Sequence, residues 1–242
     1  MSVFHFKRFD VVNERSAMKV NTDGVLLGAV MTIMPTDRRL LDIGTGTGTI
    51  ALMAAQRLSD LNNSVPLHID AIDIDEPSAS EAAANFSGSS WRDILEAHHA
   101  SLDSFADSAQ VYDLIFSNPP YFEDSLTAPD QRKSTARHTS DGLSYRDIFE
   151  FASTRLSESG RVALVLPAEQ EAALCRYARM CGLHLMRITR IRTVPRKAPS
   201  RIVAEFSRHR TEHPEDVVMT IQNEGQYTEE YLSLMKEFYL FA

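Results

Sequence analysis

Cysteine and long apolar runs are scarce in this 242-residue sequence, and each scarcity excludes a class of protein. The two cysteines, Cys175 and Cys181, lie in one helical stretch and match no disulfide or metal-binding pattern, which favours a reducing compartment. No apolar run has the length of a membrane span. Residues 1–10 alternate aromatic and basic side chains, unlike the apolar core of a signal peptide. We therefore expect a cytoplasmic protein without a membrane partner.

The sequence also lacks internal repeats and low-complexity segments. Its length and its 43% hydrophobic content suit one α/β domain with a sizeable core. We expect a single domain over residues 1–242. Within it, residues 1–36 should form an N-terminal extension of a strand pair and a helix, and residues 37–242 the core that carries the site.

Strands and helices are expected to alternate along most of the chain. The predicted strands are 39–43, 67–74, 95–100, 113–117, 161–166, 184–192, 201–207 and 217–221. The predicted helices are 21–34, 47–58, 77–86, 144–156, 169–180 and 229–240. Such alternation implies a mainly parallel sheet with helices on both faces. The strands at 184–192 and 201–207, which flank a proline-containing loop, should pair antiparallel.

A four-residue motif, Asn118-Pro119-Pro120-Tyr121, follows the buried-looking strand at 113–117. An exocyclic amine or amide nitrogen is a poor nucleophile, because its lone pair is delocalised into the adjacent π system. The Asn118 side-chain oxygen and the Pro119 carbonyl can each accept one N–H of such a group and aim its lone pair at an electrophile. The prolines stiffen the turn, and Tyr121 offers a ring for stacking. The alternative is an ordinary strand-ending turn.

A glycine-rich turn, 42–48, follows the strand at 39–43. Its glycines permit a tight turn and a close approach of the backbone to a ligand. Asp42, before the first glycine, would repel a pyrophosphate but suits the amino group of a methionine moiety. The turn therefore favours S-adenosylmethionine over NAD. Its candidate cofactor-binding residues are Asp42, Gly44, Thr45, Gly46 and Gly48.

Further polar residues follow the next two strands, at the edge of the sheet where ligands of open α/β folds bind. Asp73 is placed to accept both ribose hydroxyls, with Ile74 beside it, and Asp75 is a weaker candidate. Asp103, preceded by Leu102, could accept from the adenine amino group. The alternative for each aspartate is a cap on the helix that follows.

The net charge of −8 disfavours a protein that coats nucleic acid, but basic residues gather locally. Residues 172–204 contain eight arginines and lysines and no acidic residue. A smaller cluster follows Tyr121. We expect an RNA partner, although a solvated strand face would also explain the longer run. The candidate substrate-binding residues are Tyr121, Phe122, Arg132, Lys133, Arg137, His138, Arg196, Lys197 and Arg201.

The glycine-rich turn and the Asn-Pro-Pro-Tyr motif together resemble class I S-adenosylmethionine-dependent methyltransferases that modify exocyclic or amide nitrogens. Segments 4–9, 17–29, 227–231 and 237–240 are similar to bacterial tRNA adenine-N6 methyltransferases. The resemblance implies a Rossmann-like fold with a mainly parallel seven-stranded sheet and an antiparallel strand near the C-terminus. It implies transfer to adenine 37, in the anticodon loop of a valine tRNA, after base flipping. It also implies that Lys19, Thr22, Asp23 and Asn118 lie close to the cofactor.

Other functions compete with this interpretation. A protein glutamine methyltransferase would present the same planar nitrogen, and an amino-methyltransferase of ribosomal RNA or DNA would use the same motif. A nicotinamide oxidoreductase would not explain Asn118 to Tyr121, and a non-catalytic RNA-binding module would not need Asp42 or Asp73. No metal is expected, because His98 and His99 are adjacent and point to opposite faces of a strand. The sequence indicates no oligomeric partner.

Overall fold

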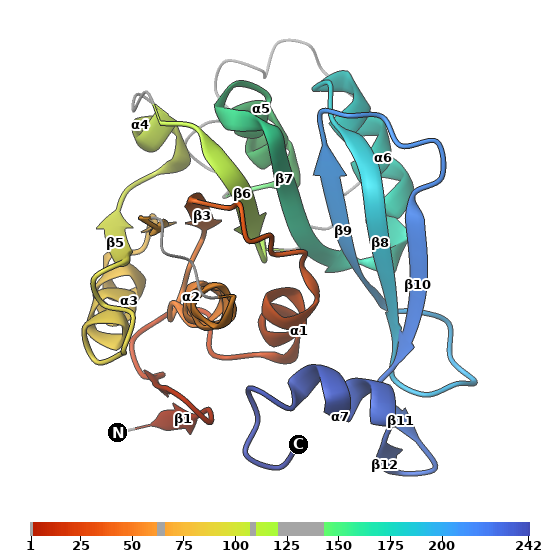
Figure 1. The fold of residues 1–242 in the computed structure, drawn as a ribbon, viewed down its shortest axis with the longest axis horizontal. Helices are drawn as coiled ribbons and strands as arrows, with labels where there is room; N and C mark the ends of the chain where they lie inside the picture. The colour runs from red at the N-terminus through yellow and green to blue at the C-terminus, as the bar shows by residue number, and fades with distance from the viewer. Residues whose placement is uncertain (1, 62–65, 107–109, 121–142) are drawn as a thin grey trace.

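The main sheet of this protein has eight strands among the residues that the computed structural model describes, which are 2–61, 66–106, 110–120 and 143–242. The strands are β3 (Arg39–Ile43), β4 (His68–Asp73), β5 (Leu95–His99), β6 (Tyr112–Ser117), β7 (Leu156–Pro167), β8 (His184–Arg192), β9 (Arg201–Ser207) and β10 (Glu215–Thr220). Their order is β10-β8-β9-β7-β6-β3-β4-β5 (Figure 1).

The sheet is mainly parallel, as expected, and β9 is its antiparallel strand, paired with both β7 and β8. The expected number of seven strands was wrong for the described chain, because β10 pairs in parallel with β8 and extends the sheet by one edge strand. The local pattern predicted β10 as a strand. The local pattern does not say which strand β10 pairs with, because that is decided by tertiary packing.

Helices cover both faces of the sheet (Figure 1). The helices are α1 (Thr22–Val30), α2 (Thr49–Asp60), α3 (Glu76–Ser87), α4 (Leu102–Ala106), α5 (Tyr145–Arg155), α6 (Glu171–Met180) and α7 (Glu229–Met235). The side chains of adjacent strand residues point to opposite faces of the sheet. Leu40 packs in the core beneath α1, α2 and α3, whereas Leu41 packs in the core beneath α5 and α6. None of the described helices is long and apolar enough to cross a membrane.

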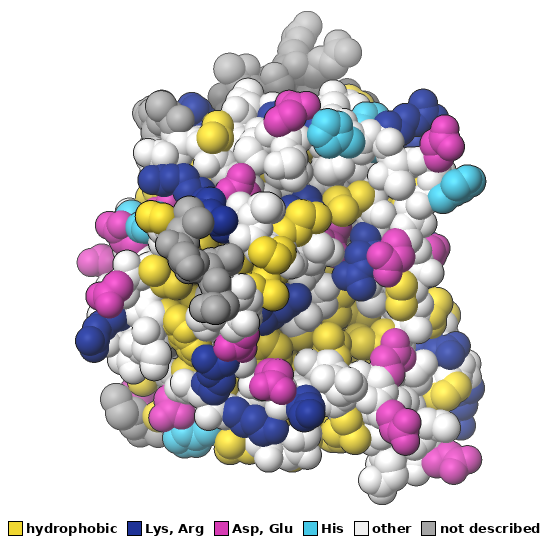
Figure 2. All heavy atoms as spheres, viewed as in Figure 1, with side chains coloured by type: hydrophobic (Ala, Val, Ile, Leu, Met, Phe, Trp, Pro, Cys, Tyr) yellow, Lys and Arg dark blue, Asp and Glu magenta, His cyan; other side chains and the backbone are white. Residues whose placement is uncertain are grey.

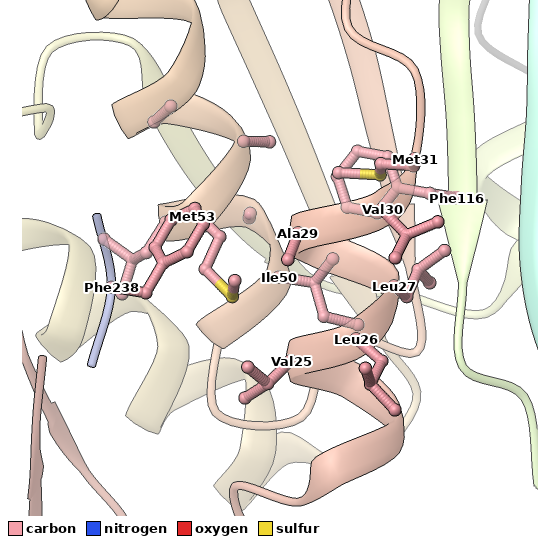
Figure 3. Packing of buried hydrophobic residues seen from close by; sticks show 14 of the residues in the cluster. Val25, Leu26, Leu27, Ala29, Val30, Met31, Ile50, Met53, Phe116 and Phe238 are labelled. Atoms are coloured by element: carbon pink, nitrogen blue, oxygen red, sulfur yellow. The ribbon is translucent and has the colours of Figure 1, made fainter. Parts of the chain in front are cut away.

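The N-terminal segment forms the expected strand pair, β1 (Val3–His5) with β2 (Asp10–Val12), and then α1. Helix α1 packs so tightly on α2 that a Cβ at Gly28 would lie 2.7 Å from the Met53 sulfur (Figure 3). The helix ends at Val30 instead of Met34. The reason is tertiary, because Glu205 of β9 accepts hydrogen bonds from the backbone N–H and the hydroxyl of Thr32.

The carboxyl ends of the parallel strands meet at one edge of the sheet. Here β3 leads into the turn before α2, β4 ends at Asp73, and β6 ends just before Asn118. Strand β8 also ends at this edge, because it runs antiparallel to β9, which runs antiparallel to β7. The residues that the sequence singled out on separate strands are thereby brought to one side of the molecule.

Candidate active site

The glycine-rich turn connects β3 to α2 with three glycines at positive φ: 71° at Gly44, 56° at Gly46 and 80° at Gly48. These values lie in the left-handed region, which residues with a Cβ rarely adopt. The N–H groups of Gly44 and Thr45 both donate to the carbonyl of Ile72, at 2.9 and 3.0 Å, and so fasten the turn to β4. Gly48 is the N-cap of α2. The partial positive charge of that helix end therefore faces the turn.

A pocket of about 330 Å³, including its solvent-open mouth, lies against this turn. Two segments and one strand end form its walls. The lining residues are Met18, Lys19, Val20, Asn21, Gly24, Val25, Gly44, Thr45, Gly46, Thr47, Thr49, Ile50 and Asn118. Five of the predicted site residues, Lys19, Gly44, Thr45, Gly46 and Asn118, thus share one cavity. The structure also adds Met18 and Asn21, which the sequence had not assigned to a ligand.

Asp42 lies behind the turn and is not among the residues that line this pocket. Its Oδ2 accepts the Thr45 hydroxyl at 2.8 Å, whereas Oδ1 accepts no well-formed hydrogen bond from the described residues. Burial raises the pKa of Asp42 to about 7, although the Thr45 hydroxyl and the nearby N–H of Ala51 oppose the shift. This placement differs from the expected contact with a cofactor amino group. It makes Asp42 a support for the turn.

Asp73 joins the end of β4 to the same turn. Its Oδ2 accepts the N–H of Gly46 at 2.8 Å, and its Oδ1 accepts the N–H of Asp75 at 2.9 Å. Partial burial raises the pKa of Asp73 above its ordinary value, against the effect of these two donors. Asp75 caps α3 by accepting from the N–H and the hydroxyl of Ser78. Of these two carboxylates, Asp73 is therefore the one that contacts the turn.

The remaining candidates at this edge lie outside the lining of the pocket. Ile74 is 74% exposed and offers an apolar surface beside Asp73. Leu102 is half-buried and Asp103 exposed, in the first turn of α4. Thr22 is exposed at the start of α1.

Asn118 is buried and extends into the pocket from the end of β6. The hydroxyl of Ser117 donates to the carbonyl of Ile43 at 2.6 Å, which ties the ends of β6 and β3 together beneath it. The Asn118 Nδ2 makes long hydrogen bonds to Asn21 Oδ1, at 3.4 Å, and Met18 Sδ, at 3.5 Å. Pro119 is buried and Pro120 exposed. Tyr121 and Phe122 lie outside the described residues.

The side-chain oxygen of Asn21 accepts two hydrogen bonds. The N–H of Gly24 donates to it at 2.8 Å, which caps α1, and the Asn118 amide donates to it at 3.4 Å. The partners are 97 residues apart in sequence, so no local pattern reveals the second contact.

A polar stripe on α3 holds the N-terminal segment in place, and the sequence analysis missed it. Both oxygens of Glu81 together accept the N–H groups of Glu14, Arg15 and Ser16, at 2.8, 2.8 and 2.9 Å. Burial alone would raise the pKa of Glu81, but these donors hold it below its usual value. Asn85, one turn on, accepts the Val12 N–H and donates to the Thr47 carbonyl. The sequence does contain a sign of this stripe, because the spacing of Ser78, Glu81 and Asn85 places them on one face of a helix.

Three of the eight basic residues in the run at 172–204 form ion pairs within the protein. Arg187 contacts Glu205 and Glu215, and Arg190 contacts Glu171 and Asp216. Arg201 forms an ion pair with Asp23, at 2.8 Å, so these two candidates join β9 to α1. On the face shown in Figure 2, basic and acidic side chains are interspersed. Contacts within the protein therefore account for Arg187, Arg190 and Arg201.

Two candidate cations, Arg196 and Lys197, are exposed in the loop between β8 and β9, at the edge where the strands end. Four other candidates, Arg132, Lys133, Arg137 and His138, lie outside the described residues.

Comparison with known proteins places the chain in a family. Residues 16–175 match the Methyltransferase small domain family. Curated relatives from Flavobacterium psychrophilum (38% identical) and Pseudoalteromonas translucida (40% identical) bear the name tRNA1(Val) (adenine(37)-N6)-methyltransferase. The first alignment covers 98% of this chain and 99% of the relative, and the second covers 99% of each. The chain belongs to this methyltransferase family. It is an S-adenosylmethionine-dependent methyltransferase, as the turn and the Asn-Pro-Pro-Tyr motif had indicated.

Solved structures agree with the methyltransferase fold. A predicted O-methyltransferase from Agrobacterium tumefaciens superposes with a TM-score of 0.62 at 16% identity, covering 89% of this chain and 96% of that one. The 16S rRNA N2 G1207 methyltransferase of Thermus thermophilus, solved with AdoMet and guanosine, gives a TM-score of 0.55 at 17% identity. It covers 86% of this chain and 50% of that one. At these identities the likeness concerns the fold, and it confirms the Rossmann-like class.

Proposed function

We propose that this methyltransferase transfers the methyl group of S-adenosylmethionine to the N6 amine of adenine 37 in tRNA1(Val). The observation that carries the proposal is the shared pocket, in which Asn118 lies beside the glycine-rich turn. Asn118 is suited to hold a planar NH₂ group, and the turn is suited to hold a nucleoside cofactor. An adenine and S-adenosylmethionine bound in this pocket could therefore contact both. The names of the curated relatives supply the tRNA and the position.

The residues around the turn fit the cofactor. Three positive-φ glycines let the backbone approach a ligand closely, and the start of α2 favours a carboxylate. Lys19 adds a positive charge to the lining, and Asp73 adds an acceptor for ribose hydroxyls at the end of β4. When bound, S-adenosylmethionine supplies an electrophilic methyl group on a sulfonium centre. We assign its binding to the turn, Lys19 and Asp73.

The chain's own task is then to present the adenine amine. The Asn118 Oδ1 and the Pro119 carbonyl would each accept one N–H of the amine and localise the lone pair on nitrogen. Both groups are held by the ordered end of β6, so little motion is needed to orient the substrate. No general base is required before transfer, because the amine attacks through its lone pair and loses its proton afterwards.

Delivery of the adenine requires the base to leave its stack in the anticodon loop. We propose that Tyr121 and Phe122 stack on the flipped base, and that the cluster Arg132, Lys133, Arg137 and His138 holds the neighbouring phosphates. Arg196 and Lys197 are exposed at the same sheet edge and suit the tRNA backbone. Arg201, paired with Asp23, would act indirectly by holding α1.

The test is methylation of a defined tRNA. The full chain, incubated with unmodified tRNA1(Val) transcript and methyl-labelled S-adenosylmethionine, should produce N6-methyladenosine, measured by mass spectrometry of the digested nucleosides. A transcript with guanosine at position 37 should stay unlabelled. Label on that control transcript, on ribosomal RNA or on protein glutamine, in place of tRNA1(Val), would assign the pocket a different substrate.

Replacing Asn21 with serine should lower kcat about 3–10-fold, the loss expected for one hydrogen bond. Serine caps a helix as well as asparagine does, but it is too short to keep the contact with the Asn118 amide. Steady-state kinetics would measure kcat, and thermal unfolding would show that the Tm is unchanged. A fall in kcat that merely tracks a lower Tm would reduce Asn21 to a helix cap.

A further inference from the structure

Four side chains with metal-ligating groups converge on one face of β4 and β5. His68 and Asp70 are two residues apart on β4 and therefore point to the same side. The parallel register places Glu96 opposite Asp70 and His98 opposite Ile72, so both β5 residues join that side. None of the four lines the cofactor pocket. The cluster is a feature that methyl transfer does not use.

The ligand atoms approach one another closely. The Nε2 atoms of His68 and His98 each lie 3.0 Å from the same oxygen of Asp70, Oδ1. The Nε2 of His68 is also 3.6 Å from Glu96 Oε2. Ligand atoms held about 2.0–2.2 Å from a tetrahedral zinc ion lie about 3.3–3.6 Å apart. The ligand atoms of His68, Asp70 and Glu96 all lie within 4.8 Å of one another, so these three are spaced nearly as in a preformed site. His98 adjoins them through its 3.0 Å contact with Asp70 and would turn towards the ion on binding.

We propose that His68, Asp70, Glu96 and His98 bind one zinc ion. Two imidazole nitrogens and two carboxylate oxygens make up a four-ligand tetrahedral set, which zinc accepts. Calcium and magnesium prefer ligand sets made of oxygen and are disfavoured by the two histidines. On binding, zinc takes the place of the imidazole protons that now face Asp70.

The surroundings of Asp70 suit a metal ligand. Its side chain is 8% exposed, and its other oxygen, Oδ2, accepts the Tyr112 hydroxyl at 3.3 Å, with Arg39 Nη1 at 3.9 Å. These contacts orient the carboxylate and leave Oδ1 directed at the two histidines. Glu96 is 60% exposed, so the fourth ligand lies at the solvent side and leaves the ion a route in.

The consequence for the protein is structural. β5 is the edge strand of the described sheet, and its outer backbone groups have no neighbouring strand. An ion shared by β4 and β5 would fasten this edge. We therefore expect zinc to raise thermal stability and to leave methyl transfer unchanged.

The experiment is a zinc titration of the full chain, prepared without a polyhistidine tag and stripped with EDTA. Isothermal titration calorimetry should give one zinc ion per chain, and cobalt in its place should show the strong visible absorption of a tetrahedral ion. The His68→Gln/His98→Gln variant should bind zinc more than about 100-fold more weakly, since loss of a ligand exceeds the 10–100-fold effect of losing an outer-shell partner. It should also lose the zinc-induced rise in Tm.

His99→Gln is the matched control. His99 is adjacent to His98 but contacts the Ile74 carbonyl, so this variant should bind zinc as the unchanged chain does. Glu96→Gln replaces an exposed ligand, keeps the fold, and should still weaken binding. Absence of zinc binding to the unchanged chain would overturn the proposal. So would equal affinity in the unchanged chain and both ligand variants, because the ion would then bind elsewhere, for example at Cys175 or Cys181.

Discussion

Replacement of Asn118 by alanine should lower kcat by at least about 100-fold while the Kd for S-adenosylmethionine stays within about threefold. The size follows from the loss of one preorganised group that acts on the reacting atoms, which costs about 100–1000-fold in rate. The cofactor should still bind, because the glycine-rich turn and Asp73 do not depend on the Asn118 amide. Single-turnover methylation of tRNA1(Val) and calorimetric titration of the cofactor measure the two quantities separately.

Asn118→Asp provides the informative companion. Aspartate keeps an acceptor oxygen for the adenine amine but loses the Nδ2 donor to Asn21, and it places two acceptors against each other. We expect a smaller loss of kcat than for alanine. If Asn118→Ala transfers methyl groups at the unchanged rate, the proposed role of the Asn-Pro-Pro-Tyr motif is wrong, whichever RNA is the substrate. If cofactor affinity falls with kcat, Asn118 instead supports the cofactor side of the pocket.

Much of the fold could be predicted from the sequence, because its strands are short buried runs between turn residues. The strand bounds 39–43, 184–192 and 201–207 are those observed, and so is the antiparallel pairing of the last two. The helix ends were less predictable. Helix α7 ends at Met235 instead of Leu240, and α1 ends early because Glu205 binds Thr32. Local propensity extends a helix until a breaker appears, whereas tertiary contacts end it sooner.

The site divides in the same way. Short motifs can be recognised in the sequence alone. Gly44, Gly46 and Asn118 were identified in this way, and in the structure they line one pocket. Contacts between segments far apart in sequence cannot be recognised in this way, as the hydrogen bonds from residues 14–16 to Glu81 show. Charge was the weakest guide, because a run of arginines in sequence says nothing of the carboxylates that face it. Arg190 illustrates this with two acidic partners from other segments.

The cluster at His68 and His98 escaped sequence analysis for a related reason. Its members pair across two strands through the register of β4 with β5, which the sequence does not encode locally. The expectation of no metal weighed only the neighbours His98 and His99. Those two side chains do contact different partners, Asp70 and the Ile74 carbonyl.

Replacement of Gly48 by alanine should destabilise the protein by about 2–5 kcal/mol, a large share of the 5–15 kcal/mol typical of a domain. Two causes add. A non-glycine residue at φ 80° costs about 1–2 kcal/mol, and overpacking costs about 1–3 kcal/mol more. The overpacking is specific, since a Cβ at Gly48 would lie 2.5 Å from Phe86 Cε1. Urea denaturation followed by circular dichroism measures the change.

Gly182→Ala separates the two causes. Gly182 has nearly the same φ, 74°, but a Cβ there would meet nothing within 4 Å, so only the conformational cost of about 1–2 kcal/mol should appear. Phe86→Leu should in turn relieve part of the Gly48→Ala defect, because leucine is shorter than the phenylalanine ring that the new methyl group meets. A double-mutant cycle should therefore give a favourable coupling free energy of about 1 kcal/mol or more. Equal destabilisation by the two glycine substitutions, with no coupling to Phe86, would contradict the close packing of α3 on the turn. Such a result would leave the positive φ of Gly48 as the remaining reason for glycine at the start of α2.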